Sequence, residues 1–393
     1  MTVHADLEKL ICELVAIESV NPDLVASGSG ESRIAAFVAG WLEAAGLSVS
    51  FVEPVAGRPS VVGVLRGSGG GSSLMLNAHM DTVGAGAMTA PFAPVVSDGR
   101  IYGRGAYDMK ASLAACMITA REARRLGLRG DLIVNAVADE EVASIGTSAV
   151  VERFRADYAI VTEPTELRLC LAHKGFVWLE VETTGVAAHG SRSDLGVDAI
   201  AHMGSILTGV LELNRRLHES PRHALLGTGS IHASLIEGGQ EMSTYPARCV
   251  AKLERRTVQG EDGASTLREI EELIGSAEAT ARVTLERAPS EVPADHGLSL
   301  AVAEAAQNPV IIGVAYWMDM ALLNGARIPT VSYGPAGEGA HADVEWVDLA
   351  SVEKCERSTY GRRSSCATEG FTSPLARADF TSPLAGALYL PAR

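Results

Sequence analysis

Residues whose side chains bind metals or transfer protons follow four short apolar runs of this sequence. The runs and the residues after them are 74–77 with His79 and Asp81, 132–137 with Glu140 and Glu141, 158–161 with Glu163, and 329–333 with His341. Imidazole nitrogens and carboxylate oxygens are common ligands of zinc, and carboxylates also act as general bases. These residue types suggest metal-assisted hydrolysis, in which one carboxylate binds metal and its neighbour transfers protons.

Each of these residues, taken alone, also has an ordinary structural explanation. An acid two residues after His79 can fix the tautomer of a metal-binding ring, but the ring could equally be structural. Asp108 precedes a helix expected at 110–126, where it would be either an N-cap or a carboxylate that bridges two cations. Glu140 and Glu141 are either a solvated pair of charges or a metal ligand beside a base.

The apolar runs alternate with helical patterns between residues 62 and 163. That alternation is typical of an α/β domain with a mostly parallel sheet. In such a sheet the carboxyl ends of the strands share one edge, and ligands bind in the crevice outside it. We therefore expect the strands to deliver both histidines and the carboxylates to a single site.

A stretch with a different pattern interrupts this domain. Strand-like segments at 176–184, 229–236, 248–256 and 281–287 alternate with helical segments at 195–217 and 264–274, the first of them behind Asp194 as a possible N-cap. The resulting order, β-α-β-β-α-β, is that of ferredoxin-like domains. The sequence therefore predicts a catalytic domain in two parts, 1–174 and 290–355, with an α+β domain inserted at 175–289.

The C-terminal segment 356–393 does not fit this plan. A helix is expected over 347–355, but the apolar periodicity ends at Glu356, and the hexapeptide that starts at Phe371 recurs from Phe380. Two copies are too few for a repeat architecture. The segment is either a loosely packed tail or the product of an altered reading frame that replaced a terminal helix.

Composition excludes several classes of function. The chain has 393 residues, 47% of them apolar, which is enough for two packed domains. Acidic residues outnumber Lys and Arg by 48 to 33, which argues against nucleic acids and anionic membranes as partners. The sequence has no apolar run long enough to span a membrane, no signal-peptide pattern and no paired spacing among its 6 cysteines. We therefore expect a reduced, cytoplasmic protein.

Five segments of the chain, taken together, resemble a known family. They are 77–83, 103–110, 139–141, 161–165 and 339–341. Their order and spacing are similar to those of the di-metal metallopeptidases that include acetylornithine deacetylase, succinyl-diaminopimelate desuccinylase, aminoacylase-1 and glutamate carboxypeptidase. The resemblance covers the chain up to about Cys355. It implies an α/β catalytic domain of the co-catalytic metallopeptidase type, with an inserted dimerisation or lid domain.

The resemblance also implies a role for each matched residue. The implied metal ligands are His79 and Glu163 for one ion, Glu141 and His341 for the other, and Asp108 as the bridge between them. Glu140 would be the general base, and Asp81 would orient His79. The implied cofactor is a pair of divalent ions; oxygen-rich ligands with one imidazole per metal suit zinc and also admit cobalt or manganese.

The implied reaction is hydrolysis of an amide C–N bond, with Glu140 passing a proton from water to the leaving nitrogen. In the wider family a glutamate at the position of Glu163 marks deacylases and carboxypeptidases, whereas an aspartate marks aminopeptidases. We therefore expect deacylation of a small N-acyl amino acid. The alternatives are a carboxypeptidase or dipeptidase acting on short peptides, a hydrolase of an unusual C–N bond and, in a different class, a catalytically idle binding homologue.

Three further candidates lie in the predicted insertion. By composition His189 is a loop histidine, but it matches the family histidine that reaches across a homodimer to stabilise an oxyanion. Arg256 lies on the strand face opposite the apolar residues and is either a surface arginine or a group that binds a substrate carboxylate. Ser243 stands where several relatives carry asparagine, so the chain departs from the family at this part of the substrate site.

Overall fold

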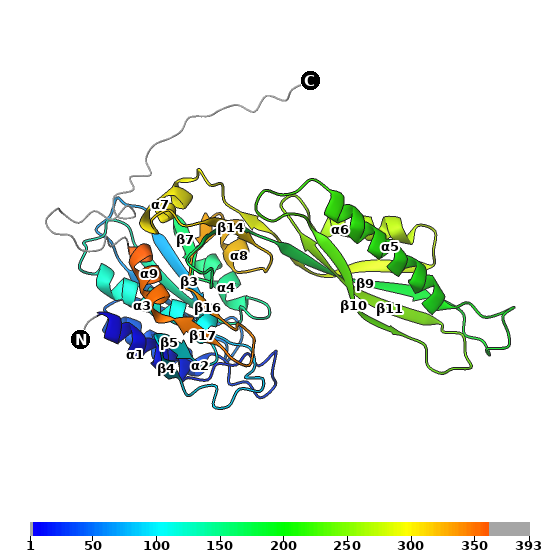
Figure 1. The fold of residues 1–393 in the computed structure, drawn as a ribbon, viewed down its shortest axis with the longest axis horizontal. Coiled ribbons are helices and arrows are strands. Elements are labelled where there is room, and N and C mark those ends of the chain that lie inside the picture. Colours follow the sequence, from blue (N-terminus) through cyan, green and yellow to red (C-terminus); the bar gives the residue numbers. More distant parts are fainter. Residues whose placement is uncertain (1–2, 361–393) are drawn as a thin grey trace, which may run out of the picture. The chain divides into compact units, whose positions relative to one another are not determined.

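The computed structural model describes residues 3–360, which form two compact units (Figure 1). Of the described residues, those up to Leu169, those of Val292–Ile311 and those from Leu322 onward form the first unit. The second unit is formed by Cys170–Glu291 and Ile312–Ala321. The insertion expected at 175–289 therefore falls within the second unit, which also takes in a later segment that the sequence pattern does not mark.

Helices and strands alternate along the part of the chain that precedes the second unit. The elements are α1 (Val3–Val15), α2 (Ser32–Ala44), β1 (Ser48–Val52), β2 (Ser60–Leu65), β3 (Leu74–His79), β4 (Val95–Ser97), β5 (Arg100–Tyr102), the turn η1 (Ala106–Lys110), α3 (Ala111–Ala123), β6 (Leu132–Val137), α4 (Ile145–Arg153) and β7 (Tyr158–Val161). After the second unit follow α7 (Gly297–Ala305), β15 (Thr330–Ser332), β16 (Gly337–Glu338), β17 (Trp346–Asp348) and α9 (Leu349–Tyr360). The elements β8 (Leu169–His173), β14 (Ile311–Val314) and α8 (Met320–Gly325) lie where the chain passes between the units.

The main sheet of the first unit has the strand order β1-β2-β6-β3-β7-β15. The strands β6, β3, β7 and β15 run parallel to one another, whereas β1 and β2 are antiparallel to their neighbours. Every residue of β6 is buried, and α3, most of whose residues are small or apolar, packs on β3 and β6. The expected α/β fold with a mostly parallel sheet is confirmed.

A second, antiparallel sheet of the first unit joins segments that lie far apart in the sequence. Its strand order is β16-β17-β5-β4. Within it, Trp346 of β17 pairs with Tyr102 of β5 and with Glu338 of β16. The sheet thereby holds the chain on both sides of His341 beside the segment that leads into Asp108.

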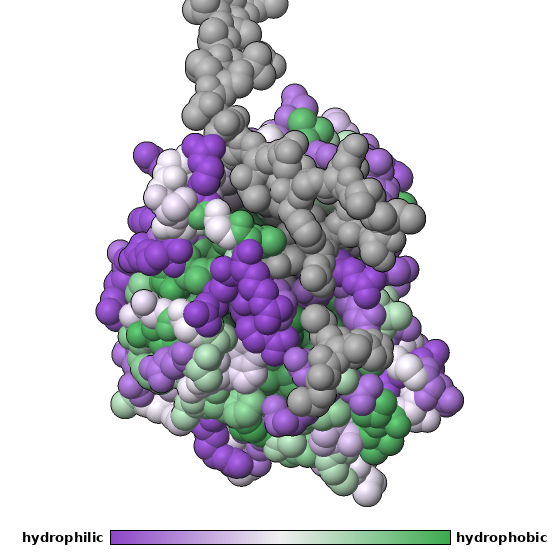
Figure 2. Space-filling view, turned by 90° about the vertical axis from the view of Figure 1, so that its left-hand side faces the viewer, coloured by the Kyte–Doolittle hydropathy of each residue, from purple (hydrophilic) through white to green (hydrophobic). Residues whose placement is uncertain are grey.

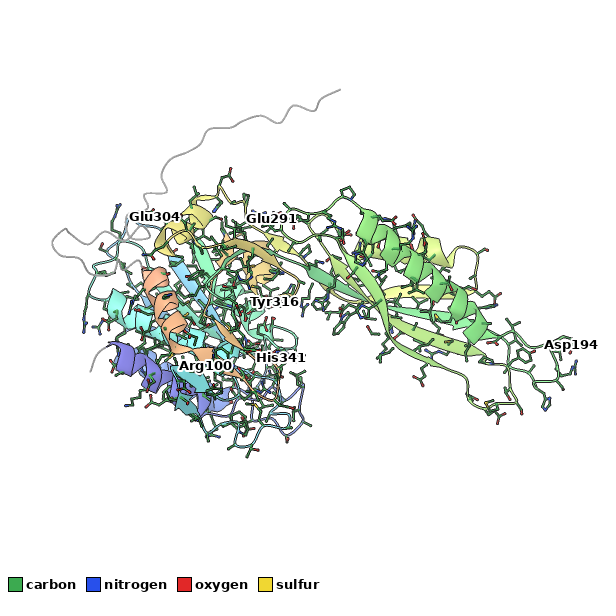
Figure 3. The ribbon with its side chains drawn as sticks, viewed as in Figure 1. Arg100, Asp194, Glu291, Glu304, Tyr316 and His341 are labelled. Atoms are coloured by element: carbon green, nitrogen blue, oxygen red, sulfur yellow. The ribbon has the colours of Figure 1, made fainter. Side chains whose placement is uncertain are left out.

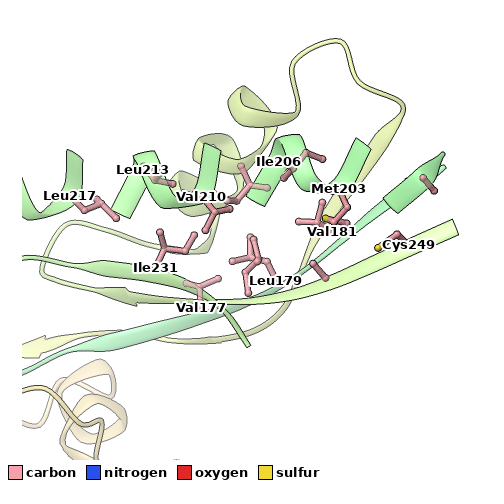
Figure 4. Packing of buried hydrophobic residues seen from close by; sticks show 14 residues of the cluster. Val177, Leu179, Val181, Met203, Ile206, Val210, Leu213, Leu217, Ile231 and Cys249 are labelled. Atoms are coloured by element: carbon pink, nitrogen blue, oxygen red, sulfur yellow. The ribbon is translucent and has the colours of Figure 1, made fainter. Parts of the chain in front are cut away.

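The second unit contains one antiparallel sheet with two helices on one face. Its elements are β9 (Gly175–Thr184), α5 (Ala199–Glu219), β10 (Ser230–Gly238), β11 (Arg248–Thr257), α6 (Gly263–Ile274) and β12 (Ala279–Arg287), and the strand order is β10-β11-β9-β12. A short strand, β13 (Ser290–Glu291), pairs with β8. Alternate residues of β9, such as Val177 and Leu179, pack against Met203 and Val210 of α5 (Figure 4). The β-α-β-β-α-β order is the one expected from the sequence.

Helix α5 begins later than its sequence predicts. Its N-cap is Asp198, whose side chain accepts hydrogen bonds from the main-chain N–H groups of Ile200 and Ala201. The predicted N-cap, Asp194, instead accepts two hydrogen bonds from Arg192 in the preceding exposed loop (Figure 3). The prediction of Asp194 as the cap is therefore wrong, because two aspartates four residues apart offer the same capping chemistry.

The last described helix, α9, extends beyond the limit expected from the sequence. It runs from Leu349 to Tyr360, and Val352, Cys355 and Glu356 are buried. The expected end of the helical pattern at Glu356 is therefore wrong, since this residue continues the buried face. The remainder of the C-terminal segment, with the repeated hexapeptides at Phe371 and Phe380, lies outside the described residues.

The described residues show surface features in keeping with the composition. Polar and charged residues are interspersed with apolar ones over the face shown in Figure 2. Between residues 3 and 360, no helix has both the length and the apolar character needed to cross a bilayer. None of the five cysteines in this range forms a disulfide.

Candidate metal centre

Four of the candidate residues lie where the parallel strands end, at one edge of the main sheet. His79 is the last residue of β3, Glu140 and Glu141 follow β6, and Glu163 follows β7. The register places His79 opposite Val137, so the ends of β3 and β6 lie side by side. As expected for an α/β sheet, the carboxyl ends of the strands deliver the polar side chains.

Asp108 lies between the two candidate histidines. Its Oδ1 is 3.0 Å from Nε2 of His79, and its Oδ2 is 3.4 Å from Nε2 of His341. It does not cap the following helix, since the N-cap of α3 is Lys110 and the cap has no side-chain hydrogen bond. The capping explanation for Asp108 therefore fails, and its two oxygens face one imidazole each.

His341 reaches the site from a strained loop. Its main chain adopts a left-handed conformation, with φ of 62°, which is uncommon for a residue with a side chain. Gly339 precedes it with φ of 88°, and a Cβ there would lie 1.8 Å from the carbonyl oxygen of Val344. Nε2 of His341 is 3.0 Å from Oε2 of Glu141. Figure 3 labels this side chain, which is about half exposed.

The remaining candidates complete two overlapping groups of metal-binding atoms. One group contains His79, Glu140 and Glu163, the other His79, Asp108 and Glu141, and the atoms of each lie within 4.8 Å of one another. Among the described residues, Oε1 of Glu141 is buried without a hydrogen-bond partner, which is unfavourable unless a cation or donor binds it. Imidazole nitrogens beside several carboxylate oxygens match the donor preferences of divalent cations. The residues therefore fit a metal centre.

The electrostatics of the metal-free site show how closely these charges interact. Burial lowers the pKa of His79, but the hydrogen bond to Asp108 and the charges of Glu163 and Asp108 outweigh it, so the pKa lies well above its ordinary value. Hydrogen bonds to Asp108 and Glu141 raise the pKa of His341 to about 10. Burial raises the pKa of Glu141. Without metal, protons on the two imidazoles thus offset the carboxylate charges.

Asp81 acts on the site differently from the expectation. Nδ1 of His79 donates to the main-chain carbonyl of Asp81 at 2.9 Å, whereas the carboxylate of Asp81 is 3.6 Å away. That carboxylate instead accepts from the main-chain N–H groups of Glu140 and Glu141, at 3.1 and 3.2 Å, and from Asn21 at 2.8 Å. Asp81 therefore fixes the His79 tautomer through its main chain and the loop with Glu140 through its side chain.

A buried network behind this loop was missed by the sequence analysis. Asn21 donates to Asp139 at 2.9 Å, and Arg58 donates to both Asp139 and Glu31. Asp139 adopts a left-handed conformation with φ of 68°, directly before Glu140. These buried polar groups hold the turn that presents Glu140 and Glu141. No local pattern marks Asn21 or Arg58, because their partners lie far away in the sequence.

The other predicted site residues, His189, Ser243 and Arg256, belong to the second unit. Thr244 forms an isolated bridge with His189, and the carbonyl of Ser243 accepts from the N–H of Gly190 at 2.7 Å. The structure therefore brings His189 and Ser243 together. Ser191 donates its main-chain N–H to Nδ1 of His189, which leaves the ring proton on Nε2.

Arg256 is partly exposed on the face of the sheet that no helix of the second unit covers. Its guanidinium donates to Glu254 at 2.7 Å and lies 5.2 Å from the ring centroid of Phe176. The neighbouring Arg255 points to the helix-covered side, where it is buried and bonded to Glu261 and Glu269. The alternation expected for β11 is thus observed, but the guanidinium of Arg256 already has an acidic partner.

Comparison with curated proteins finds relatives along most of the chain. The chain is 29% identical to acetylornithine deacetylase of Proteus mirabilis over 88% of this chain and 92% of that protein. It is also 29% identical to acetylornithine deacetylase of Erwinia tasmaniensis, over 87% of this chain and 92% of that protein. The deformylase of Bacillus subtilis that acts on N-formyl-4-amino-5-aminomethyl-2-methylpyrimidine is 30% identical over 55% of each chain.

Solved structures and a family model agree with this similarity. Aminopeptidase PepT of Bacillus cereus has a TM-score of 0.76 at 18% identity, over 91% of this chain and 97% of that one. A metallo-carboxypeptidase of Sulfolobus solfataricus has a TM-score of 0.72 at 19% identity, over 90% of this chain and 98% of that one. At identities this low, the similarity of both structures concerns the fold alone. The model of peptidase family M20/M25/M40 matches residues 75–360, which include all the candidate metal ligands. The chain belongs to peptidase family M20/M25/M40.

Proposed function

We propose that this chain, a metal-dependent hydrolase, removes the acyl group from an N-acyl amino acid. The similarity to acetylornithine deacetylases over most of the chain is the observation that carries the proposal. The deformylase relative, by its name, also removes an acyl group from nitrogen, which favours N-acyl cleavage over removal of a C-terminal residue. The deformylase equally supports a second candidate, namely cleavage of a formamide outside the amino acids.

The proposed ligands are Asp108, the two histidines in contact with it, and one carboxylate beside each histidine. They are His79 and Glu163 for one cation, Glu141 and His341 for the other, and Asp108 between them. Bound there, a pair of divalent cations supplies a water of lowered pKa and polarises the substrate carbonyl. We propose zinc as the resident metal, because imidazole with carboxylate oxygens suits it, with cobalt or manganese as substitutes.

The chain's own residues perform the proton transfers. Glu140, whose carboxylate lies within 4.8 Å of the ligand atoms of His79 and Glu163, accepts the proton of the attacking water. It then returns this proton to the leaving nitrogen, so that the amine departs neutral. Asp81 keeps Glu140 in place through the hydrogen bond from the main chain of Glu140. In this proposal Glu140 is the base and the adjacent Glu141 is a metal ligand, both in the same turn.

His189 is proposed to stabilise the oxyanion in the site of a second subunit. Its Nε2 carries the ring proton, since Nδ1 accepts from the main chain of Ser191, and an N–H group is what an oxyanion requires. If subunits share sites, mixing inactive Glu140→Ala chains with inactive His189→Ala chains restores part of the activity. Each variant alone serves as the control, and failure to recover activity in verified mixed dimers contradicts the shared site.

A turnover screen tests the proposed reaction. Acetyl-, succinyl- and formyl-amino acids are compared with dipeptides, each with zinc, cobalt or manganese, and the Glu140→Gln chain serves as a blank. We expect turnover of at least one N-acyl amino acid that exceeds the turnover of every dipeptide. Faster cleavage of dipeptides would overturn the proposal in favour of a peptidase, and bound metal without any turnover would favour an idle binding homologue.

Metal binding is expected to release protons. Both imidazoles have raised pKa values in the metal-free chain, so at neutral pH each must lose a proton before it binds a cation. The raised pKa of His341 in the folded chain stabilises the metal-free protein fully below about pH 6.5, the ordinary pKa of the ring. This stabilisation is lost as the pH rises through the folded-state pKa of about 10. Metal affinity therefore increases with pH over this range, while metal-free stability falls.

Calorimetry in buffers of different ionisation enthalpy measures this release. We expect about two protons per chain at pH 7 on saturation with zinc, one from each imidazole. The His341→Gln chain, which lacks one of the rings, should release about one fewer. Binding without proton release would contradict the described protonation of His79 and His341.

A further inference from the structure

Glu345 is a buried carboxylate that the proposed reaction does not use. It is 1% exposed, and each of its oxygens accepts two hydrogen bonds. Oε1 accepts from the main-chain N–H groups of Tyr107 and Asp108, at 2.9 and 3.0 Å. Oε2 accepts from the N–H of Gly105 at 2.9 Å and from Arg104 at 2.7 Å. Glu345 therefore holds the main chain of the turn that carries Asp108.

Arg104 links the same carboxylate to the loop of His341. It is also 1% exposed, and its Nη1 donates to Glu345 while its Nη2 donates to the carbonyl of Ala342 at 2.8 Å. Ala342 is the residue after His341, whose left-handed conformation needs external support. The guanidinium of Arg104 and the carboxylate of Glu345 therefore connect the main chain of the Asp108 turn to the main chain of the His341 loop.

We propose that Arg104 and Glu345 are positioning residues that set the distance between Asp108 and His341 and so determine the affinity for one of the two cations. The inference rests on the proposed ligands, but it assigns a role to residues that touch neither cation nor substrate. The cation held by Glu141 and His341 depends on this distance. The cation held by His79 and Glu163 depends on the position of Asp108 but not on that of His341, so its affinity should change less.

Glutamine cannot replace Glu345 in this arrangement. Each carboxylate oxygen faces two donors, so an amide NH₂ in either place would meet two N–H groups and leave them without an acceptor. The size of the side chain is nevertheless kept, so the change tests hydrogen bonding instead of packing. Arg104→Lys is the milder change, because lysine keeps the positive charge beside Glu345. A single ammonium nevertheless cannot span Glu345 and Ala342 as the guanidinium fork does.

Titration of the metal-free chains with cobalt(II), followed by visible absorption, tests the inference. The wild-type chain should bind two ions. The Glu345→Gln chain should bind the ion of Glu141 and His341 about 10–100-fold more weakly and the other ion with a smaller loss of affinity. Arg104→Lys should weaken the same ion less. With cobalt at a fixed, near-saturating concentration, kcat should fall while KM stays the same, since no substrate contact is lost.

Glu122→Gln is the matched control. Glu122 is likewise a buried glutamate, on α3, that pairs with Arg121 and Arg125. Its substitution should leave both cobalt affinities unchanged, even if thermal unfolding of the metal-free chain shifts as it does for Glu345→Gln.

Three results distinguish failure of the inference from failure of the proposed function. Two cobalt ions bound by Glu345→Gln with wild-type affinities would overturn the inference alone, as would equal weakening in Glu122→Gln. If Glu345→Gln does not fold, Arg104→Lys decides the question by the same titration. A wild-type chain that binds no cation would overturn the proposed function and the inference with it.

Discussion

The Glu140→Gln chain is expected to lose turnover by about 10²–10⁴-fold while it keeps its metal ions. Glutamine has the shape of glutamate but cannot accept the proton of the attacking water. The main-chain hydrogen bond of residue 140 to Asp81 does not involve the side chain, so the turn should stay in place. The measurement is kcat on the best substrate of the screen, together with metal content after dialysis.

Glu152→Gln provides the comparison for this prediction. Glu152 is an exposed residue on α4 in the same unit, so the substitution makes the same chemical change away from the site. Its kcat should equal that of the wild-type chain. A Glu140→Gln chain with kcat within about 10-fold of wild type would show that another group transfers the proton.

The Asp108→Asn chain is expected to lose metal and, with it, all measurable activity. Asp108 is the one side chain in contact with both imidazoles, at 3.0 and 3.4 Å, among the residues that the structure describes. Burial raises its pKa, but hydrogen bonds from His341 and His79 lower it more, so the group stays ionised. An amide removes this charge and one of the two ligand oxygens. Metal affinity should fall by more than about 100-fold, measured by metal analysis after dialysis against a graded chelator.

Asp98→Asn tests whether such a loss is specific. Asp98 lies in an exposed turn with φ of 50°, a conformation that asparagine also tolerates. This control should retain both ions and full activity. If Asp108→Asn keeps two ions at wild-type affinity, Asp108 does not bridge the cations, and the proposed ligand set is wrong.

Much of the fold and of the centre could be predicted because the informative residues are local in sequence. Apolar runs such as 132–137 directly precede their acidic residues, and parallel strands end at one edge. The adjacent carboxylates of Glu140 and Glu141 at such a strand end are enough to suggest a metal ligand beside a base. The helix-covered and open faces of β11 followed equally from the alternation of its residues.

The remaining features depend on contacts across long sequence separations. Arg104 stands directly before the segment of Asp108, and Glu345 lies four residues after His341, but nothing local shows that they meet. The orientation of Asp81 was also unpredictable, because its carbonyl and its carboxylate are both acceptors near the ring of His79, and only the carbonyl accepts its hydrogen bond. The start of α5 required a choice between two equivalent aspartates, which only the tertiary structure makes.

The position of the second unit within the sequence determines when the metal centre can form during synthesis. Arg104 and Glu345 are 241 residues apart, and both segments of the second unit, Cys170–Glu291 and Ile312–Ala321, are made between them. Since domains generally fold as units while the chain emerges from the ribosome, the second unit can fold before His341 is made. Until then the chain contains four of the five proposed ligands, namely His79, Asp108, Glu141 and Glu163, with an excess of negative charge. The centre therefore closes only once nearly all of the described chain has left the ribosome.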